Sequence, residues 1–171
     1  SDLAWLIVHV LKPEFIHVKV PLHSQPLAHL ALVVCEHQAR NGKYASVQGA
    51  MREEGDKAQE EIFKRVGWER YFDLSKEWSY YRSHGCQLGS VRGGPPRPNQ
   101  AMKKAWWWLA NFDLHGLELR CNTCSHTHAV ARGNASGPQA ERVAASTVSD
   151  VYPEPLAAVY ALEVRKAFLS Q

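Results

Sequence analysis

The sequence predicts an α/β fold, in which an open sheet of about four strands is flanked by helices and followed by a helical C-terminal extension. Three observations lead to this prediction. Residues 15–48 show strand, helix and strand patterns with a single crossover, which is typical of a βαβ unit with parallel strands. Two further strand patterns follow at 77–83 and 104–110. The last third of the chain has helical patterns.

Capping and breaking residues set the expected boundaries in the first half. Asp2 can cap a first helix that Pro13 would end, because proline disfavours helix at the residue before it. Ser24 is an N-cap for the crossover helix, which Asn41-Gly42 ends with a left-handed turn. The expected elements are a helix at 2–12, a strand at 15–20, the crossover helix, and a strand at 44–48 that ends at Gly49. The predicted buried stripe of the crossover helix is Leu27, Leu30, Ala31, Val34, Cys35 and Gln38.

The second half is divided by a loop rich in glycine and proline at 88–100. A charged helix at 56–66 and a strand at 77–83 precede this loop. The strand at 104–110 and a short helix at 113–119 follow it. We expect a main domain over 1–131 and a helical extension over 132–171, which packs on that domain or on a partner. A polar linker at 132–137 would open the extension, with helices at 139–149 and 155–169.

Composition narrows the class of protein without naming a function. The apolar fraction of 45% and the charged fraction of 22% are ordinary for a globular chain of 171 residues. Because the apolar run Leu3 to Leu11 is short, contains His9 and has no basic residues before it, we expect no secretory signal and no membrane span. The net charge of +3 allows a nucleic-acid partner but does not require one. We therefore expect a soluble, intracellular protein.

The clearest chemical pattern is a run of cysteine and histidine residues. Cys121 and Cys124 form a C-x-x-C pair, and His126 and His128 follow it. Thiolate and imidazole groups are the usual zinc ligands in proteins, and Cys86 could join them from the preceding loop. A zinc ion with four protein ligands would be structural. The alternatives are a reduced loop without metal and a Cys/His nucleophile pair, for which the sequence shows no orienting third group.

Two other features are candidates for partner contacts. Trp106, Trp107 and Trp108 alternate along one predicted strand, so one face belongs in the core. Since the chain has 6 tryptophans, we expect some of these three to lie at a protein interface. Arg92 and Arg97 make the glycine- and proline-rich loop basic, which suits either a protein neighbour or a phosphate backbone.

Several short motifs, in order along the chain, resemble one family. The residues that carry the resemblance are Gln38 to Gly42, Gly85-Cys86-Gln87-Leu88-Gly89, Met102-Lys103-Lys104, Leu109-Ala110-Asn111, Cys121 with His126-x-His128, and Tyr152-Pro153. Together they resemble the C-terminal part of the cytosine-C5-methyltransferase-like domains found in phage genes and mobile-element polyproteins. The resemblance covers nearly the whole chain and implies a partial Rossmann-like sheet.

The departures from this family concern its chemistry. In active members a cysteine follows the proline of the first strand's exit loop and attacks cytosine, whereas Leu22 stands at that position here. A glutamate that holds the flipped base is replaced by Gln48, whose amide supplies neither proton nor charge. No G-x-G-x-x-G occurs, so the chain is expected to begin after the part that binds S-adenosylmethionine.

The sequence thus favours a non-enzymatic, methyltransferase-derived module that acts as an accessory or structural subunit of a larger assembly. One alternative is a zinc-stabilised nucleic-acid-binding module. The other is one part of a split DNA cytosine methyltransferase whose nucleophile comes from another chain.

Overall fold

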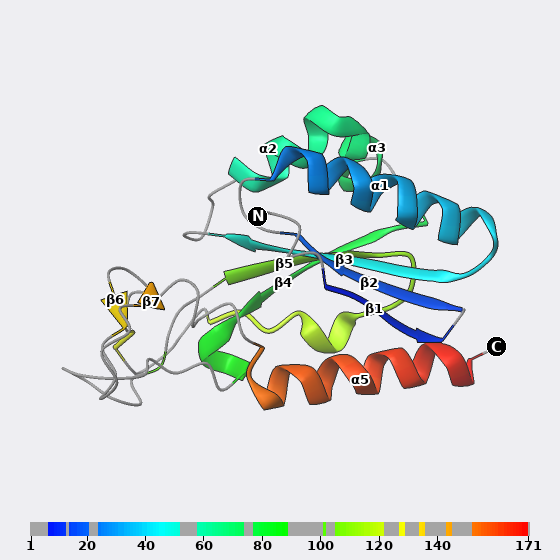
Figure 1. Cartoon of the computed structure of the whole chain (residues 1–171). Helices are drawn as coiled ribbons and strands as arrows, with labels where there is room; N and C mark the ends of the chain where they lie inside the picture. Colours follow the sequence, from blue (N-terminus) through cyan, green and yellow to red (C-terminus); the bar gives the residue numbers. More distant parts are fainter. Residues whose placement is uncertain are drawn as a thin grey trace.

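The structure is a computed structural model that describes residues 7–12, 14–20, 24–51, 58–73, 77–88, 101, 105–121, 127–128, 134–135, 143–144 and 152–170. The expected α/β architecture with an open sheet is confirmed (Figure 1). The strands are β1 (Ile7–Lys12), β2 (Phe15–Lys19), β3 (Tyr44–Met51), β4 (Ser79–His84), β5 (Ala105–Ala110), β6 (Asn134–Ala135) and β7 (Val143–Ala144). The helices are α1 (Gln25–Arg40), α2 (Ala58–Phe63), the π-helical turn η2 (Lys64–Trp68), α3 (Glu69–Asp73), the 3₁₀ turns η3 (Gly85–Leu88) and η4 (His115–Leu117), and α5 (Glu154–Leu169).

The main sheet has five strands in the order β1-β2-β3-β5-β4. Strands β2 and β3 are parallel and α1 connects them, as expected for a βαβ unit. The other neighbouring pairs in this sheet are antiparallel. Strands β6 and β7 form a separate antiparallel pair. The fifth strand of the main sheet is β1, in a segment for which we expected a helix.

Two helical layers cover the sheet (Figure 1). Helices α1, α2 and α3 lie on one face, and α5 lies on the other. Each layer has its own hydrophobic cluster: Trp107, Trp68 and Phe63 belong to the one beneath α1, and Trp106 and Trp108 to the one beneath α5. Because both faces are covered, the inner strands are buried on both sides and read as apolar runs.

Helix α1 follows the expectation closely. Ser24 occupies the N-cap position and proline lies in the first turn, although the serine side chain makes no capping hydrogen bond. The helix ends before Gly42, which has a φ of +67°, a conformation that glycine adopts without strain. Its buried residues are Leu27, Ala28, Ala31, Leu32, Cys35 and Gln38. Leu30 is 39% exposed and Val34 is half-buried, so the buried stripe lies slightly to one side of the predicted one.

Three expected boundaries are wrong. Residues 7–12 form β1 rather than a helix, because the β-branched residues Ile7, Val8 and Val10 pair along β2. Gly49 does not end β3, which continues to Met51 because residues 49–51 still pair with β5. Val143–Ala144 pairs with β6 instead of forming a helix, and the rest of 139–149 lies outside the described residues.

The remaining elements agree with the expectation in kind. The strand patterns at 15–20, 77–83 and 104–110 correspond to β2, β4 and β5, and the last helix corresponds to α5. The charged helix at 56–66 is shorter, since α2 gives way to η2 at Lys64. Only one 3₁₀ turn, η4, forms in the described segment 113–119.

Candidate metal centre

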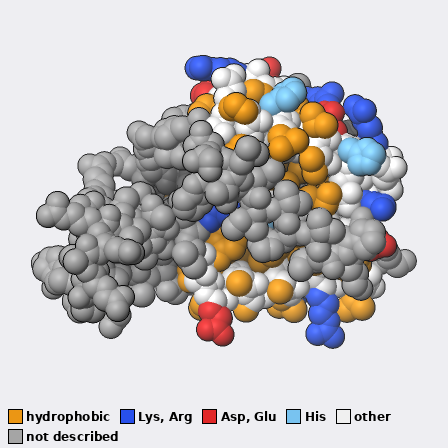
Figure 2. Space-filling model, viewed as in Figure 1, with side chains coloured by type: hydrophobic (Ala, Val, Ile, Leu, Met, Phe, Trp, Pro, Cys, Tyr) orange, Lys and Arg blue, Asp and Glu red, His pale blue; other side chains and the backbone are white. Residues whose placement is uncertain are grey.

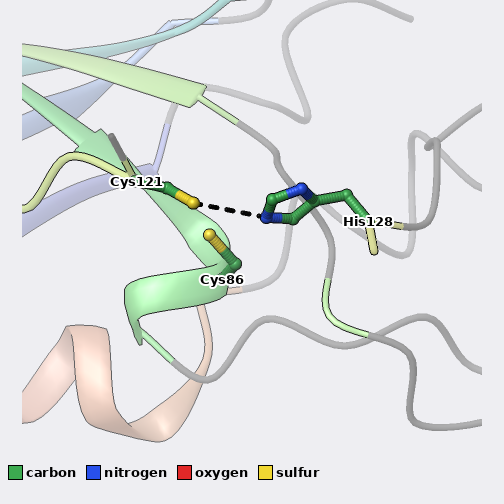
Figure 3. Close-up of side chains that lie close together, drawn as sticks. All are labelled: Cys86, Cys121 and His128. Carbon is green, nitrogen blue, oxygen red and sulfur yellow. Dashed lines mark hydrogen bonds between the residues drawn. The ribbon is translucent and has the colours of Figure 1, made fainter. Parts of the chain in front are cut away.

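Cys86, Cys121 and His128 form a group at the end of β4, which we call the Cys/His cluster (Figure 3). One ligand atom from each residue lies within 4.8 Å of the other two. The sulfur of Cys121 lies 3.4 Å from Nε2 of His128, and the sulfur of Cys86 points toward the same space. Cys121 is 7% exposed, whereas Cys86 and His128 are half-buried. The cluster therefore lies at the border between the core and the surface.

The distances suit a tetrahedral zinc ion with little rearrangement. Zinc bonds to sulfur and nitrogen place two ligand atoms roughly 3.6 Å apart across a tetrahedral angle. The sulfur–nitrogen distance of 3.4 Å in the Cys121–His128 pair is already close to that value. The widest pair, at no more than 4.8 Å, would need to close by about 1 Å. The donor set therefore fits zinc in both chemistry and spacing.

Cys86 takes its position from the end of a buried strand. Ser83 and His84 at the end of β4 are 0% and 2% exposed, and η3 begins at the next residue. The Ser83 hydroxyl accepts a hydrogen bond from Trp108 Nε1 at 2.8 Å and donates to the Leu117 carbonyl at 2.6 Å. The strand end is thus bonded both to β5 and to the segment that leads to Cys121.

Cys121 is positioned by His84, a residue that we did not predict to be part of the site. The His84 amide donates to the Leu119 carbonyl at 2.8 Å. The Cys121 amide in turn donates to His84 Nδ1 at 2.7 Å, which requires the proton of a neutral His84 to be on Nε2. These two bonds place residues 119–121 along the end of β4, beside Cys86. A lone histidine in a strand pattern gives no sequence signal for this role.

The oxidation states of the two cysteines differ. Cys121 is disulfide-bonded, whereas Cys86 is outside any disulfide. Zinc binds cysteine as the thiolate, so Cys121 can act as a ligand only in its reduced form. Of the five predicted metal ligands, the structure brings together Cys86, Cys121 and His128. Cys124 and His126 lie outside the described residues.

The expectation that some of the three tryptophans form an interface is wrong. Trp106, Trp107 and Trp108 are each 0% exposed. Strand β5 lies between β3 and β4, so one helical layer covers Trp107 and the other covers Trp106 and Trp108. Arg92 and Arg97, the other predicted contact residues, lie outside the described residues.

A second polar group lies beneath α5 and consists of His17, Ser46, Gln48, Tyr152 and Tyr160. We call it the α5-face network. The three strand residues are at most 2% exposed. Its hydrogen bonds join His17 to Ser46 (2.9 Å) and Tyr152 (3.1 Å), Ser46 to Tyr160 (2.7 Å), and Tyr152 to Gln48 (2.6 Å). Leu22, the other position that the sequence resemblance singled out, lies outside the described residues.

The α5-face network has one consistent direction of proton donation. Gln48 donates from Nε2 to the Gly49 carbonyl at 2.6 Å, so its oxygen accepts the Tyr152 hydroxyl proton. His17 Nε2 must then donate to the Tyr152 oxygen, and in a neutral imidazole Nδ1 accepts from Ser46. Ser46 in turn accepts from Tyr160, whose pKa is raised by burial. Every member is therefore satisfied within the chain.

The described part of the surface carries both apolar and charged side chains. Figure 2 shows apolar side chains scattered between charged and histidine side chains on the face in view. Among the residues that the structure describes, the exposed large apolar ones are Leu30 and Val33 on α1 and Leu162 and Leu169 on α5. In the described part of the chain, no helix is both long enough and apolar enough to span a membrane. No protein-family model, curated protein or solved structure matches the chain.

Proposed function

We propose that this chain is a non-catalytic domain that a structural zinc ion stabilises at the Cys/His cluster, and that it serves as an accessory subunit of a larger assembly. The observation that carries the proposal is the convergence of Cys86, Cys121 and His128 within 4.8 Å. Cysteine sulfur with imidazole nitrogen is the donor set that zinc prefers.

A fourth ligand would close the site. The sequence offers Cys124 and His126, which lie between two of the described ligands in the chain. With four protein ligands, zinc has no open position for water or substrate, so its role is structural. The reduced cysteines would bind as thiolates and His128 through the nitrogen that now faces Cys121.

The location of the cluster explains how zinc would stabilise the fold. Cys86 follows β4, while Cys121 and His128 belong to a segment more than thirty residues further along the chain. A metal bond between these segments closes a long loop, and the binding free energy adds to the free energy of unfolding. At a free zinc concentration one hundred times the Kd, this contribution is about 2.7 kcal/mol.

The α5-face network supports the non-catalytic part of the proposal. Gln48 stands where the resembling family has its base-holding glutamate, and it is 0% exposed. Its oxygen accepts from Tyr152 and its nitrogen donates to a backbone carbonyl. A nucleobase at this position would have to displace Tyr152 and break both bonds of the hydroxyl. The internal hydrogen bonds of Gln48 and Tyr152 thus support a role without base binding.

The test is zinc stoichiometry on the reduced protein. The chain is reduced, incubated with zinc, desalted and measured by elemental analysis, and it should retain one zinc per chain. Cys86→Ser and His128→Gln should each lose the metal. His29→Gln, which changes an exposed histidine on α1, is the matched control and should retain it. Zinc retention in His128→Gln equal to that of the unchanged chain would refute the site.

Thermal unfolding gives the second readout. Chelation should lower the Tm of the reduced, zinc-loaded chain and of His29→Gln, but not that of Cys86→Ser, because this variant holds no metal that a chelator could remove. A methyl-transfer assay with S-adenosylmethionine and cytosine-containing DNA tests the other half of the proposal. Incorporation of methyl groups by this chain would contradict it.

A further inference from the structure

We infer that the Cys/His cluster is a thiol–disulfide switch, in which zinc binding and oxidation of Cys121 exclude one another. The inference rests on the proposed zinc site and adds its regulation. Cys121 is disulfide-bonded, yet its sulfur lies 3.4 Å from His128 Nε2 and within 4.8 Å of the Cys86 sulfur. The oxidised state therefore keeps the other ligands close to the sulfur that the reduced state would give to zinc.

The exclusion follows from the chemistry of a single atom. A sulfur in a disulfide has no negative charge and is a poor zinc ligand, whereas zinc requires the thiolate. Zinc must therefore favour the reduced form by the same factor by which reduction favours zinc binding. The metal protects Cys121 from oxidation, and oxidation of Cys121 releases the metal.

The sequence supplies Cys124 as the second thiol of the switch, because it is the other cysteine of the C-x-x-C pair. Cys35 and Cys86 are outside any disulfide. The C-x-x-C spacing of Cys121 and Cys124 is that of reactive dithiol pairs. Cys86 thus remains a thiol in both states and is available to bind zinc again after reduction.

The oxidation step balances with a small-molecule disulfide such as oxidised glutathione. One protein thiolate attacks a sulfur of the oxidant, forms a mixed disulfide and displaces one glutathione thiolate. The second protein thiolate attacks the protein sulfur of the mixed disulfide and displaces the other. Two electrons pass from the cysteine pair to the oxidant, and zinc leaves as Zn²⁺ without a change of oxidation state.

The remaining cysteine of the chain serves as an internal reference. Cys35 is 0% exposed in the core beneath α1, and burial raises the pKa of its thiol to about 12. Without thiolate and without access, it does not react with the oxidant at neutral pH. Oxidation measured on the folded chain therefore reports on the Cys/His cluster.

The experiment measures zinc release and disulfide formation on the same sample. Reduced, zinc-loaded protein receives oxidised glutathione, a chromophoric chelator records zinc, and mass spectrometry of the alkylated chain records the Cys121 disulfide. One zinc should be released for each disulfide formed. Free zinc at about ten times its Kd should slow disulfide formation about tenfold, because only the metal-free fraction of the chain then presents an unbound Cys121 thiolate. In His128→Gln, which keeps both thiols, zinc should have no such effect.

The outcomes separate this inference from the function on which it rests. If the reduced chain binds no zinc, both are wrong. If it binds zinc but retains the metal after Cys121 is oxidised, the zinc site stands and the switch is refuted. Equal oxidation rates with and without bound zinc would also refute the switch. Reduction of the oxidised chain should restore one zinc per chain, and failure to do so would equally contradict a reversible switch.

Discussion

The α5-face network and the Cys/His cluster are both polar groups that adjoin the hydrophobic core, but they differ in the kinds of atoms that they bring together. The α5-face network is a directed chain of hydrogen bonds in which each donor meets an acceptor of the same protein. The Cys/His cluster instead brings two sulfurs and an imidazole within 4.8 Å, without a carboxylate or a cation among them. The hydrogen bonds of the α5-face network thus run between side chains of the protein, whereas the donor set of the Cys/His cluster suits a metal ion.

The two groups also differ in the elements that surround them. In the α5-face network, α5 supplies Tyr160, and Tyr152 lies just before the helix, so the helical layer completes the network. Side chains of the same chain therefore fill the space between α5 and this face of the sheet. The Cys/His cluster instead lies just beyond the end of β4, where η3 supplies Cys86 and the segment after Leu119 supplies Cys121.

Among these predictions, His17→Ala in the α5-face network should cause the largest loss of stability. His17 is 2% exposed, contacts the Trp108 ring and bonds to two side chains. Its removal leaves a cavity and takes a hydrogen-bond partner from Ser46 and from Tyr152. We expect the free energy of unfolding in urea to fall by about 3 kcal/mol. The exposed His29→Ala should change it by less than about 0.5 kcal/mol. Equal effects at the two positions would show that the network contributes no stability.

Tyr152→Phe should have a smaller effect and tests whether the network acts as a unit. The change removes one hydroxyl, so the buried Gln48 oxygen loses its donor and His17 loses its acceptor. We expect a loss of about 1–2 kcal/mol by urea unfolding.

A double-mutant cycle with Gln48→Leu isolates the bond between the two residues. Once the glutamine oxygen is gone, Tyr152→Phe should cost less, with a coupling of at least about 0.5 kcal/mol. Additive losses within the error of the measurement would mean that the two side chains are energetically independent. This result would contradict a stabilising hydrogen bond between Tyr152 and Gln48.

The sequence predicted the fold better than the details of either group. Strand and helix periods identified β2, α1, β4, β5 and α5, because those elements carry alternating or helical apolar patterns. The segment of β1 was misassigned because a plausible cap and a following proline outweighed its β-branched residues. Its pairing with β2 is a long-range fact that no local pattern contains.

The part of the candidate site that depends on residue type alone was predictable from the sequence. Cysteine and histidine at short spacing pointed to the metal, and the structure brings three of the five predicted ligands together. His84 was missed because its role depends on two backbone bonds across the sheet end. The tryptophans were misjudged because a local sequence cannot show that β5 is an inner strand covered on both faces.

Cys35 sharpens the comparison because it is a cysteine that belongs to neither polar group. Burial raises the pKa of its thiol from 9.0 to about 12. The unfolded chain therefore loses this proton at lower pH than the folded chain, so the contribution to stability is intact below pH 9 and falls as the pH rises toward 12. Between pH 9 and pH 10 the loss should be about 1 kcal/mol.

Urea unfolding at pH 8, 9 and 10 measures this effect, with the unchanged chain compared with Cys35→Ala. The variant is expected to be less stable at every pH because of the cavity, but its stability should fall less steeply over this range. The difference between the two slopes of unfolding free energy against pH reports the ionisation of the Cys35 thiol, whereas the difference in stability at one pH also contains the cavity. The window stops at pH 10 because burial also raises the pKa of Tyr160 above its usual 10.0, which adds a second loss at higher pH. Parallel pH profiles would mean that Cys35 ionises as easily in the folded chain as in the unfolded one. The distinction between a packing cysteine beneath α1 and ligand cysteines at the end of β4 would then fail.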